Sequence, residues 1–308
     1  MPSTASPTRS DAPADPESIA RLRRFNRAVT TATGALDASF LGRGRPLGGA
    51  RVLHARGAEG REVGAARAHL ALDSGLASRL LRTLEAEGLV ETGRHPDDGR
   101  RRIARPTAKG RAEQREYDRL SDDHAAATLA GFGRAAPELL AAMDRIACAL
   151  GRERIALRVA DPEAADARAC LAAYYAELDR RFAAGFRVED SGDPEADKLR
   201  PPRGAFLLAE FDGAAIACGG LTPLPDADMK TGEIKRLWIA PAARGLGLSL
   251  RMMEALEARA RGYGMARLRL DTNGALTEAS ALYRRLGWVE TGRYNDNPYA
   301  ELFFEKRL

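Results

Sequence analysis

The stretch IKRLWIAPAARGLGLSLRMMEALEARA, residues 234–260, decides the fold of the second half of the chain. An apolar run ends at Pro241, and two glycines, Gly245 and Gly247, then precede a helical pattern. Because glycine has no Cβ, the backbone of such a turn can come close to a ligand. The first N–H groups of the next helix lack intrahelical partners, and the helix dipole favours an anion there. With Arg244 beside it, the turn predicts a pyrophosphate site; a plain strand-to-helix turn is the alternative.

The segments around this turn alternate between strand and helix patterns. A strand and an amphipathic helix, separated by Asp161-Pro162, come first, and a hairpin that turns at Asp212-Gly213 follows. A further strand leads into the quoted turn, and after its helix come a strand, a helix that ends at Gly287 and a last strand. The order β-α-β-β-β-α-β-α-β predicts an α/β domain with a mixed sheet.

The length of 308 residues predicts two domains. No apolar run approaches the ~18–20 residues that a membrane-spanning helix needs, and the Pro/Ser/Ala/Asp-rich start lacks the apolar segment of a secretion signal. Residues 1–16 are therefore expected to be a disordered tail. The three cysteines have no metal-ligand spacing and indicate a reduced, cytoplasmic protein without a metal site: Cys148, Cys170 and Cys218.

Positive charge is concentrated in the first half. Residues 1–150 carry 24 Lys and Arg against 19 Asp and Glu, whereas the remainder carries 24 of each. Within residues 43–111 the count is 15 basic against 8 acidic residues. This asymmetry indicates a polyanionic partner for that region; an arginine-rich solvated surface is the alternative.

The first half opens with helical patterns, of which the one in LDSGLASRLLRTLEAEGLV, residues 72–90, is the most informative. Asp73 or Ser74 can cap this helix, and Gly88 can end it. Its leucines form a buried stripe and leave small and polar residues, then arginines, on the outward face, a layout that suits the major groove of DNA. The outward residues are Ser74, Gly75, Ala77, Ser78, Arg79 and Arg82. Helices are also expected over 17–40, 50–57, 62–70, 108–131 and 137–150.

A charged hairpin is predicted directly after that helix. Residues 89–94 and 102–107 flank the tip HPDDGRRR, in which Pro96 and Gly99 supply the turn. The tip carries an arginine cluster where a wing would touch the minor groove or the DNA backbone, with a solvated surface as the alternative. The cluster consists of Arg100, Arg101 and Arg102.

These features resemble the MarR family of winged helix-turn-helix regulators over about residues 17–150. The resemblance rests on SRLLRTLEAEGLVETGRHPDDGRRRIARPTAKG, with the Asp98-x-Arg100 pair and Thr107-x-x-Gly110; Pro106 stands where the family usually has Leu. It implies binding to double-stranded DNA and a homodimer built from interlocking terminal helices of this half. An apolar stripe would supply part of that interface, with a core within the chain as the alternative: Leu139, Leu140, Met143, Ile146 and Leu150.

The second half, roughly residues 153–308, resembles the GNAT superfamily, the Gcn5-related N-acetyltransferases. Their acetyl-CoA loop, Arg/Gln-x-x-Gly-x-Gly/Ala, is matched by Arg244 to Ser249, with serine in place of the final small residue. The resemblance implies that acetyl-CoA is the cosubstrate, that the strand before the loop pairs with its pantetheine arm, and that neighbouring strands separate to admit the thioester. The implied cofactor-binding residues are Leu237, Trp238, Ile239, Arg244, Gly245, Leu246, Gly247, Leu248, Ser249 and Asn273.

Two residues are expected to be catalytic. Glu233 lies where several members of the superfamily keep a glutamate that acts as a base, and Tyr283 occupies the position of the tyrosine whose hydroxyl protonates the leaving sulfur. A surface or substrate-binding role for Glu233 and core packing for Tyr283 are the alternatives. Leu276 stands where the family often has Asn, so one common polar contact is missing. Tyr294–Asn297 are expected to border the acceptor pocket or to form a polar turn.

The ending GRYNDNPYAELFFEKRL resembles that of actinobacterial proteins in which a MarR-like half is fused to a GNAT half. The sequence therefore predicts a mainly α winged helix-turn-helix domain over 17–150 and an α/β GNAT domain with a mixed, mostly antiparallel central sheet over 151–308. The expected function is a transcriptional regulator that also transfers acetyl directly to a small-molecule amine or amino acid, since no cysteine lies in a motif for a covalent intermediate. The alternatives are a second half that only senses acetyl-CoA or an amine, and a first half that serves dimerisation alone.

Overall fold

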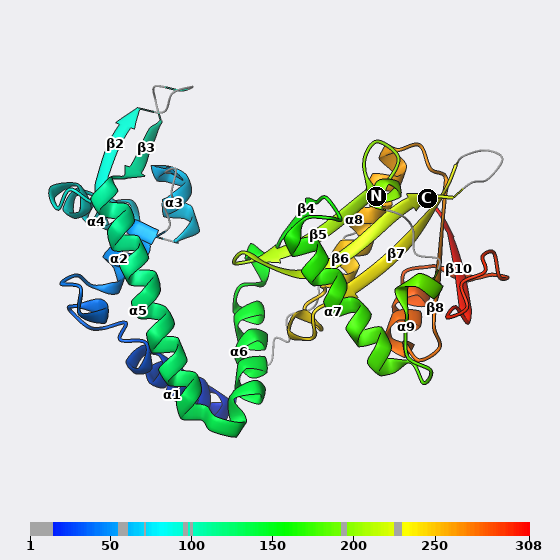
Figure 1. The fold of residues 1–308 in the computed structure, drawn as a ribbon, viewed down its shortest axis with the longest axis horizontal. Helices are drawn as coiled ribbons and strands as arrows, with labels where there is room; N and C mark the ends of the chain where they lie inside the picture. The colour runs from blue at the N-terminus through cyan, green and yellow to red at the C-terminus, as the bar shows by residue number, and fades with distance from the viewer. Residues whose placement is uncertain are drawn as a thin grey trace. The chain divides into compact units, whose positions relative to one another are not determined.

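The computed structural model describes residues 15–54, 61–70, 72–94, 98, 101–191, 196–224 and 230–308. The chain forms two compact units, Met1–Gly133 and Arg134–Leu308 (Figure 1). This division falls before the helix expected over 137–150, whereas the domain boundary expected from the sequence follows that helix. Among the described residues, no helix is both long enough and apolar enough to cross a membrane.

Helix α1 (Pro16–Ala32) is shorter than the helix expected over 17–40, and that expectation is wrong beyond residue 32. The hydroxyls of Thr30 and Thr33 donate to carbonyl oxygens one turn earlier, which competes with the hydrogen bonds that would continue the helix. Gly34 then has a φ of +61°, a left-handed conformation that glycine tolerates and that ends helices.

The rest of the first unit combines short helices with a three-stranded sheet. Its elements are the 3₁₀ turn Phe40–Gly42, α2 (Leu47–His54), β1 (Arg61–Glu62), α3 (Val63–His69), α4 (Ser74–Ala86), β2 (Val90–Arg94) and β3 (Arg102–Pro106). The strand order is β1-β3-β2, and antiparallel β2 and β3 form the predicted hairpin. Of the two candidate caps, Asp73 caps α4, because its side chain accepts a hydrogen bond from Leu76 N at 2.9 Å. Gly88, with a φ of +69°, follows the end of α4.

Two longer helices follow the hairpin, α5 (Ala108–Phe132) and α6 (Ala136–Leu150). The start of α5 packs closely against Leu89, which lies between α4 and β2, because a Cβ at Gly110 would lie 1.9 Å from Leu89 O. The apolar stripe of α6 is exposed rather than packed into a core within the chain: Leu139, Leu140, Met143, Ile146 and Leu150.

The second unit is an α/β fold around a seven-stranded sheet of order β4-β5-β6-β7-β8-β10-β9. Among the described residues of this sheet, β7 and β8 pair in parallel and the other strand pairs are antiparallel, so the predicted mixed, mostly antiparallel sheet is confirmed. The elements are β4 (Ala156–Val159), α7 (Ala165–Arg181), β5 (Ala205–Phe211), β6 (Ala214–Pro223), β7 (Thr231–Ile239), α8 (Leu248–Gly262), β8 (Arg267–Thr272), α9 (Thr277–Arg285), β9 (Val289–Glu290) and β10 (Leu302–Arg307).

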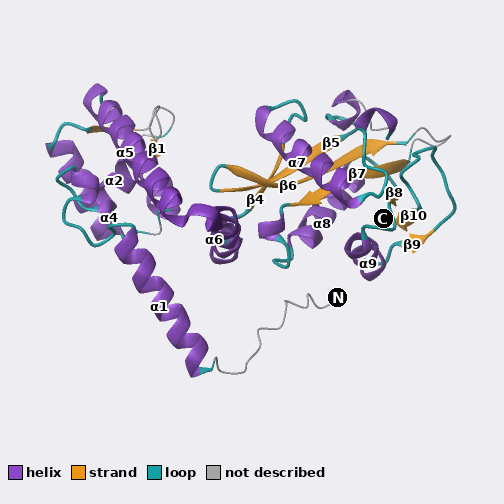
Figure 2. Ribbon diagram, turned by 60° about the horizontal axis from the view of Figure 1, so that its bottom comes forward, coloured by secondary structure: helices purple, strands orange, loops and turns teal. Residues whose placement is uncertain are grey.

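The two faces of this sheet carry separate hydrophobic clusters, because side chains alternate along a strand. Ala205 and Leu207 of β5 belong to the cluster that contains the buried side chains of α8 and α9. Phe206 and Leu208, the intervening residues, belong to the cluster that contains those of α7. Helices α7 and α8 accordingly lie on opposite sides of the sheet (Figures 1 and 2).

Strands β7 and β8 pair along only part of their length. The parallel pairing covers Thr231–Glu233 and Arg267–Arg269. The later residues of β7 and the end of β8 instead line opposite walls of a cavity. The structure therefore contains the gap between strands that the GNAT resemblance implied, and this gap places the candidate site at the centre of the sheet.

Candidate functional site

The glycine turn after β7 has the geometry that close approach of a ligand requires. Gly245 and Gly247 have φ of +78° and +77°, in a region where residues with a Cβ are strained. Gly247 is the N-cap of α8, and a Cβ at either glycine would meet no atom within 4 Å. The turn is thus open on its outer side, and the N–H groups that begin α8 have no intrahelical partners. Leu246 packs on the hydrophobic core.

A cavity of about 680 Å³, here called the cofactor groove, lies beside this turn. Arg181 and Arg285 line it together with Arg244, so it offers guanidinium groups as well as backbone N–H groups to phosphates. Of the cofactor-binding residues predicted from the sequence, it is lined by Leu237, Trp238, Ile239, Arg244, Gly245, Gly247, Leu248 and Ser249. These residues fit acetyl-CoA, with the turn suited to its pyrophosphate and the apolar end of β7 suited to its pantetheine arm.

Glu177 of α7 holds two of the groove's side chains in place. Its Oε2 accepts hydrogen bonds from Arg244 Nη2 at 2.6 Å and from Trp238 Nε1 at 2.8 Å. Burial opposes ionisation of Glu177, but the hydrogen bonds from Arg244 and Trp238 outweigh it and lower the pKa of this carboxyl. Glu177 was not among the residues expected from the sequence; its signal there is an acidic residue next to Leu178 on the buried side of α7.

We expect two substitutions of Glu177 to change acetyl-CoA binding in opposite directions. Gln keeps an oxygen that can accept from Arg244 but removes a negative charge from a site for phosphates, so Glu177→Gln should tighten the Kd about threefold. Glu177→Ala removes the acceptor and frees Arg244 to move, so it should weaken the Kd about tenfold. Calorimetry on the full chain measures both values. Equal weakening by both substitutions would contradict the charge argument.

Tyr283 of α9 lines both the cofactor groove and a second, smaller cavity in the gap between β7 and β8. Its side chain is 6% exposed and packs against Trp288 and Phe304. Burial, assisted by the negative charge of Asp271, raises the pKa of the Tyr283 phenol. The hydroxyl therefore stays protonated at neutral pH and can donate a proton where the two cavities meet.

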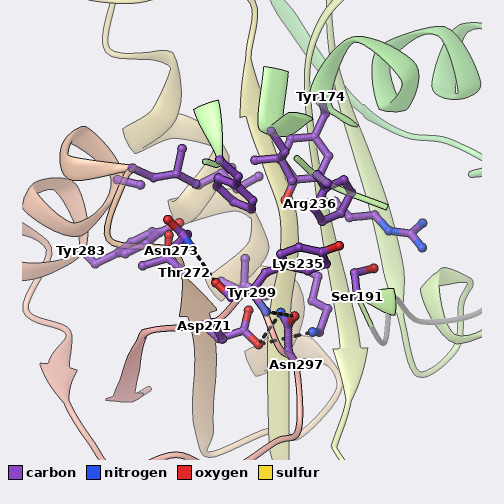
Figure 3. A pocket seen from close by; sticks show the side chains of 18 residues that line it. Tyr174, Ser191, Lys235, Arg236, Asp271, Thr272, Asn273, Tyr283, Asn297 and Tyr299 are labelled. Carbon is purple, nitrogen blue, oxygen red and sulfur yellow. Dashed lines mark hydrogen bonds and ion pairs between the residues drawn. The ribbon is translucent and has the colours of Figure 1, made fainter. Parts of the chain in front are cut away.

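The smaller cavity, here called the acceptor cavity, contains a carboxylate that was not among the residues expected from the sequence (Figure 3). Asp271, at the end of β8, accepts hydrogen bonds from Asn295 at 2.6 Å and Asn297 at 3.3 Å, and Lys235 Nζ lies 3.6 Å from it. Its signal in the sequence is an acidic residue near the end of a strand, at the edge where α/β proteins bind ligands. The predicted polar segment Tyr294–Asn297 thus supplies two side chains that fix this carboxylate.

Glu233 lies directly behind this cavity rather than along its wall. It is 5% exposed, and its Oε1 accepts hydrogen bonds from Tyr294 Oη at 2.9 Å and Asn295 Nδ2 at 3.2 Å. Lys235 Nζ lies 3.5 Å from the same oxygen. Burial raises the pKa of Glu233, and Asp271 acts in the same direction although Lys235 opposes it. A carboxylate with a raised pKa is a better base, and Asn295 links it to Asp271.

The raised pKa of Glu233 predicts a change of stability with pH. A carboxyl whose pKa is higher in the folded than in the unfolded protein contributes stability below its unfolded pKa, and loses that contribution as pH rises through its folded pKa. Glu233→Gln removes this loss, so the variant should gain stability relative to the wild type as the pH rises above about 4, the unfolded pKa of a glutamate. Urea unfolding at a series of pH values measures the difference. The exposed Glu153 supplies a control, since Glu153→Gln should show no such trend.

Two further predicted or expected residues lie at the acceptor cavity. Asn273 lines this cavity and not the cofactor groove, and its amide is engaged with backbone, donating to Tyr299 O at 2.8 Å and accepting from Ala275 N at 2.9 Å. Leu276 lines both cavities, so an apolar side chain lies at their junction where the family often has Asn.

In the first unit, the exposed face of α4 carries most of the predicted DNA-binding residues. Ser74, Ser78, Arg79 and Arg82 are exposed. Ala77 is 8% exposed and belongs to the buried side of the helix, so its expected place on the outward face is wrong. Its place one turn before Leu81 and three residues after Ser74 puts it at the edge of the leucine stripe.

The predicted arginine cluster at the hairpin is described in part, because Arg100 lies outside the described residues. Arg101 pairs with Asp98 at 3.3 Å and with Glu62 at 3.5 Å, and Arg102 donates to Thr92 Oγ1. Both arginines remain exposed, so their remaining N–H groups can face a polyanion.

Comparisons with known proteins agree with both halves of this description. The acetyltransferase (GNAT) family model matches residues 171–288, and the MarR family model matches residues 47–101. An IAA acetyltransferase of Azospirillum brasilense is 32% identical over 136 residues, which are 43% of this chain and 86% of the relative. The N-acetyltransferase YjgM of Escherichia coli (strain K12) is 33% identical over 100 residues, 31% of this chain and 60% of the relative. A solved structure from Klebsiella pneumoniae, described as an acyl-CoA N-acyltransferase, is 28% identical with a TM-score of 0.40, and the match covers 50% of this chain and 97% of that one.

The MarR match implies DNA binding by the first half, and GNAT acetyltransferases use acetyl-CoA, for which the cofactor groove provides the lining. The chain belongs to the GNAT family of acetyltransferases, as an N-acetyltransferase whose first half is matched by the MarR family model over residues 47–101.

Proposed function

We propose that this chain is a DNA-binding regulator that transfers acetyl from acetyl-CoA directly to a small-molecule amine or amino acid. The observation that carries the proposal is the position of Tyr283, which lines both the cofactor groove and the acceptor cavity. A thioester in the groove and an amine in the cavity can therefore meet beside a protonated phenol, without a covalent intermediate on the protein.

The groups at the two cavities account for the bonds and the protons of the transfer. The amine nitrogen attacks the thioester carbonyl, so a C–N bond forms and the C–S bond breaks. Before the attack, the ammonium form of the acceptor gives one proton to the carboxylate pair, Asp271 at the cavity and Glu233 behind it, which Asn295 connects; the excess proton on nitrogen after the attack passes to solvent. Tyr283 donates its proton to the departing thiolate and is reprotonated from solvent.

For the first unit, we propose a homodimer on double-stranded DNA. Every residue of α1 is exposed or only partly buried, and a row of its apolar side chains covers no core formed by the residues that the structure describes. The row consists of Ile19, Leu22, Phe25 and Val29. The exposed stripe of α6 offers a second apolar surface of the same kind. Light scattering coupled to size-exclusion chromatography should give twice the mass of the chain, and a monomer would contradict the dimer.

The proposed domain limits are 17–150 and 151–308, and the proposed compartment is the cytoplasm. Each cysteine is a buried free thiol, as expected of small apolar residues in a reducing compartment. Expression of residues 151–308 alone, followed by thermal unfolding, tests whether the second domain folds without α6.

Release of free thiol from acetyl-CoA in the presence of a panel of amines and amino acids tests the catalytic proposal. We expect thiol release that depends on both the full-length protein and one class of amine, with the acetylated amine detected by mass spectrometry. Binding of acetyl-CoA without amine-dependent thiol release would favour a sensor instead and would contradict turnover.

A further inference from the structure

One wall of the acceptor cavity is aromatic. Tyr174, Phe182, Phe186 and Tyr299, here called the aromatic wall, all line it. Ring centroids lie 5.9 Å apart for Phe182–Phe186, 5.8 Å for Phe182–Tyr299 and 4.9 Å for Phe186–Tyr299. Such distances allow a further ring to pack against them in the offset or edge-to-face arrangements that aromatic groups prefer.

The aromatic wall is held in place by hydrogen bonds between three separate segments. Arg187 N donates to Tyr299 Oη at 3.1 Å, and Phe186 N donates to Asp179 at 3.0 Å. The backbone of Tyr299 is fixed as well, because its carbonyl accepts from Asn273. A wall fixed in this way before a ligand arrives loses little conformational entropy on binding.

The opposite side of the cavity carries charged groups. Asp271 lines it, Glu233 lies behind Asp271, and Lys235 lies within 3.6 Å of both carboxylates. Asp271 is the carboxylate among the described residues that line this cavity, so it is the group that an ammonium ion can approach. A buried negative charge attracts a cation, and the cation that the proposed reaction brings is a protonated amine.

We propose that the acceptor is a primary amine whose carbon chain carries an aromatic ring. The ring packs against the aromatic wall, and the ammonium group points toward Asp271. This inference rests on the proposed function, because it assigns the acceptor of the same transfer. An alkylamine of similar length would keep the charge interaction and lose the ring packing.

Simple arylalkylamines and aromatic amino acids both satisfy this chemistry. They differ in the carboxylate that an amino acid carries beside its amine. A comparison of 2-phenylethylamine with L-phenylalanine therefore shows which of these two kinds of amine is the acceptor. Either result is consistent with the inference.

Calorimetry on the full chain saturated with coenzyme A tests the inference with four probes. We expect 2-phenylethylamine or L-phenylalanine to bind about tenfold more tightly than n-hexylamine, as ring packing of this kind predicts. We expect 3-phenylpropionate, which has the ring but no ammonium, to bind at least about tenfold more weakly than 2-phenylethylamine. Equal affinity for 2-phenylethylamine and n-hexylamine, or no binding of either aromatic amine, would overturn the inference.

Two matched pairs of variants separate the ring from the charge. Phe186→Leu should reduce the preference for 2-phenylethylamine over n-hexylamine, whereas Phe211→Leu, at the far end of β5, should not. Asp271→Asn should weaken both amines equally by about tenfold, whereas Asp190→Asn at an exposed position should not. If a variant does not fold, the comparison of the four probes on the wild-type protein still tests the inference.

Thiol release measured on the same four probes keeps the two proposals apart. Tight binding of an aromatic amine without thiol release would leave the acceptor class intact and refute the acetyl transfer. Thiol release that is faster with n-hexylamine than with either aromatic amine would leave the transfer intact and refute the acceptor class.

Discussion

Replacing Tyr283 by Phe should lower kcat about 100-fold while leaving the Kd for acetyl-CoA unchanged, because general acid catalysis contributes 10²–10⁴-fold. The substitution removes one hydroxyl from a buried ring and keeps its packing against Trp288 and Phe304. Since burial raises the pKa of this phenol, the lost group is a proton donor at neutral pH. Without it, the thiolate must leave unprotonated or take its proton from water.

Steady-state kinetics and calorimetry with acetyl-CoA together measure this result. Tyr263→Phe is the matched control, because Tyr263 packs on the same hydrophobic core at the end of α8 but lines neither cavity. That control should retain kcat within about twofold. A Tyr283→Phe enzyme with full kcat would show that Tyr283 only packs, and the proton would then need another donor.

Local signals in the sequence were sufficient for the elements that frame the site. The glycine turn, the strand before it and the cap Asp73 depend on residues close together in the chain, and the structure forms them as expected. The predicted end of α1 was wrong because apolar spacing alone takes no account of threonine hydroxyls that donate hydrogen bonds back to the helix. Ala77 was misplaced because a small residue fits either side of a helix, and packing decides which.

The contacts that define the two cavities join distant parts of the chain, and no local pattern encodes them. Glu177 of α7 meets Arg244 after β7, and Tyr299 near the end of the chain meets Phe186 after α7. Asp271 forms an ion pair with Lys235 of the neighbouring strand β7. These pairs follow from strand order and from the separation of β7 and β8, which the resemblance implied in outline but without naming the side chains.

The double variant Arg79→Ala/Arg82→Ala should weaken DNA binding about 100-fold at fixed salt concentration, because each guanidinium contact with a phosphate or a guanine contributes about 1–3 kcal/mol. Both side chains are exposed on α4, on the face opposite its buried leucines. Neither belongs to the hydrophobic core, so the variant should keep the stability of the wild type. The probe is a DNA duplex that the wild-type protein selects from a random library, and fluorescence anisotropy measures the Kd.

The salt dependence of the same titrations identifies the kind of contact. If both arginines neutralise phosphates, the slope of log Kd against log salt concentration should fall by about two, since each released counterion contributes about one. An unchanged slope with the same loss of affinity would instead place them on bases. Arg168→Ala/Arg259→Ala removes the same charge from exposed positions of the second unit and should leave the affinity within about twofold. Equal losses of DNA affinity in the two double variants would show that net charge alone explains the effect. That result would contradict a recognition role for α4.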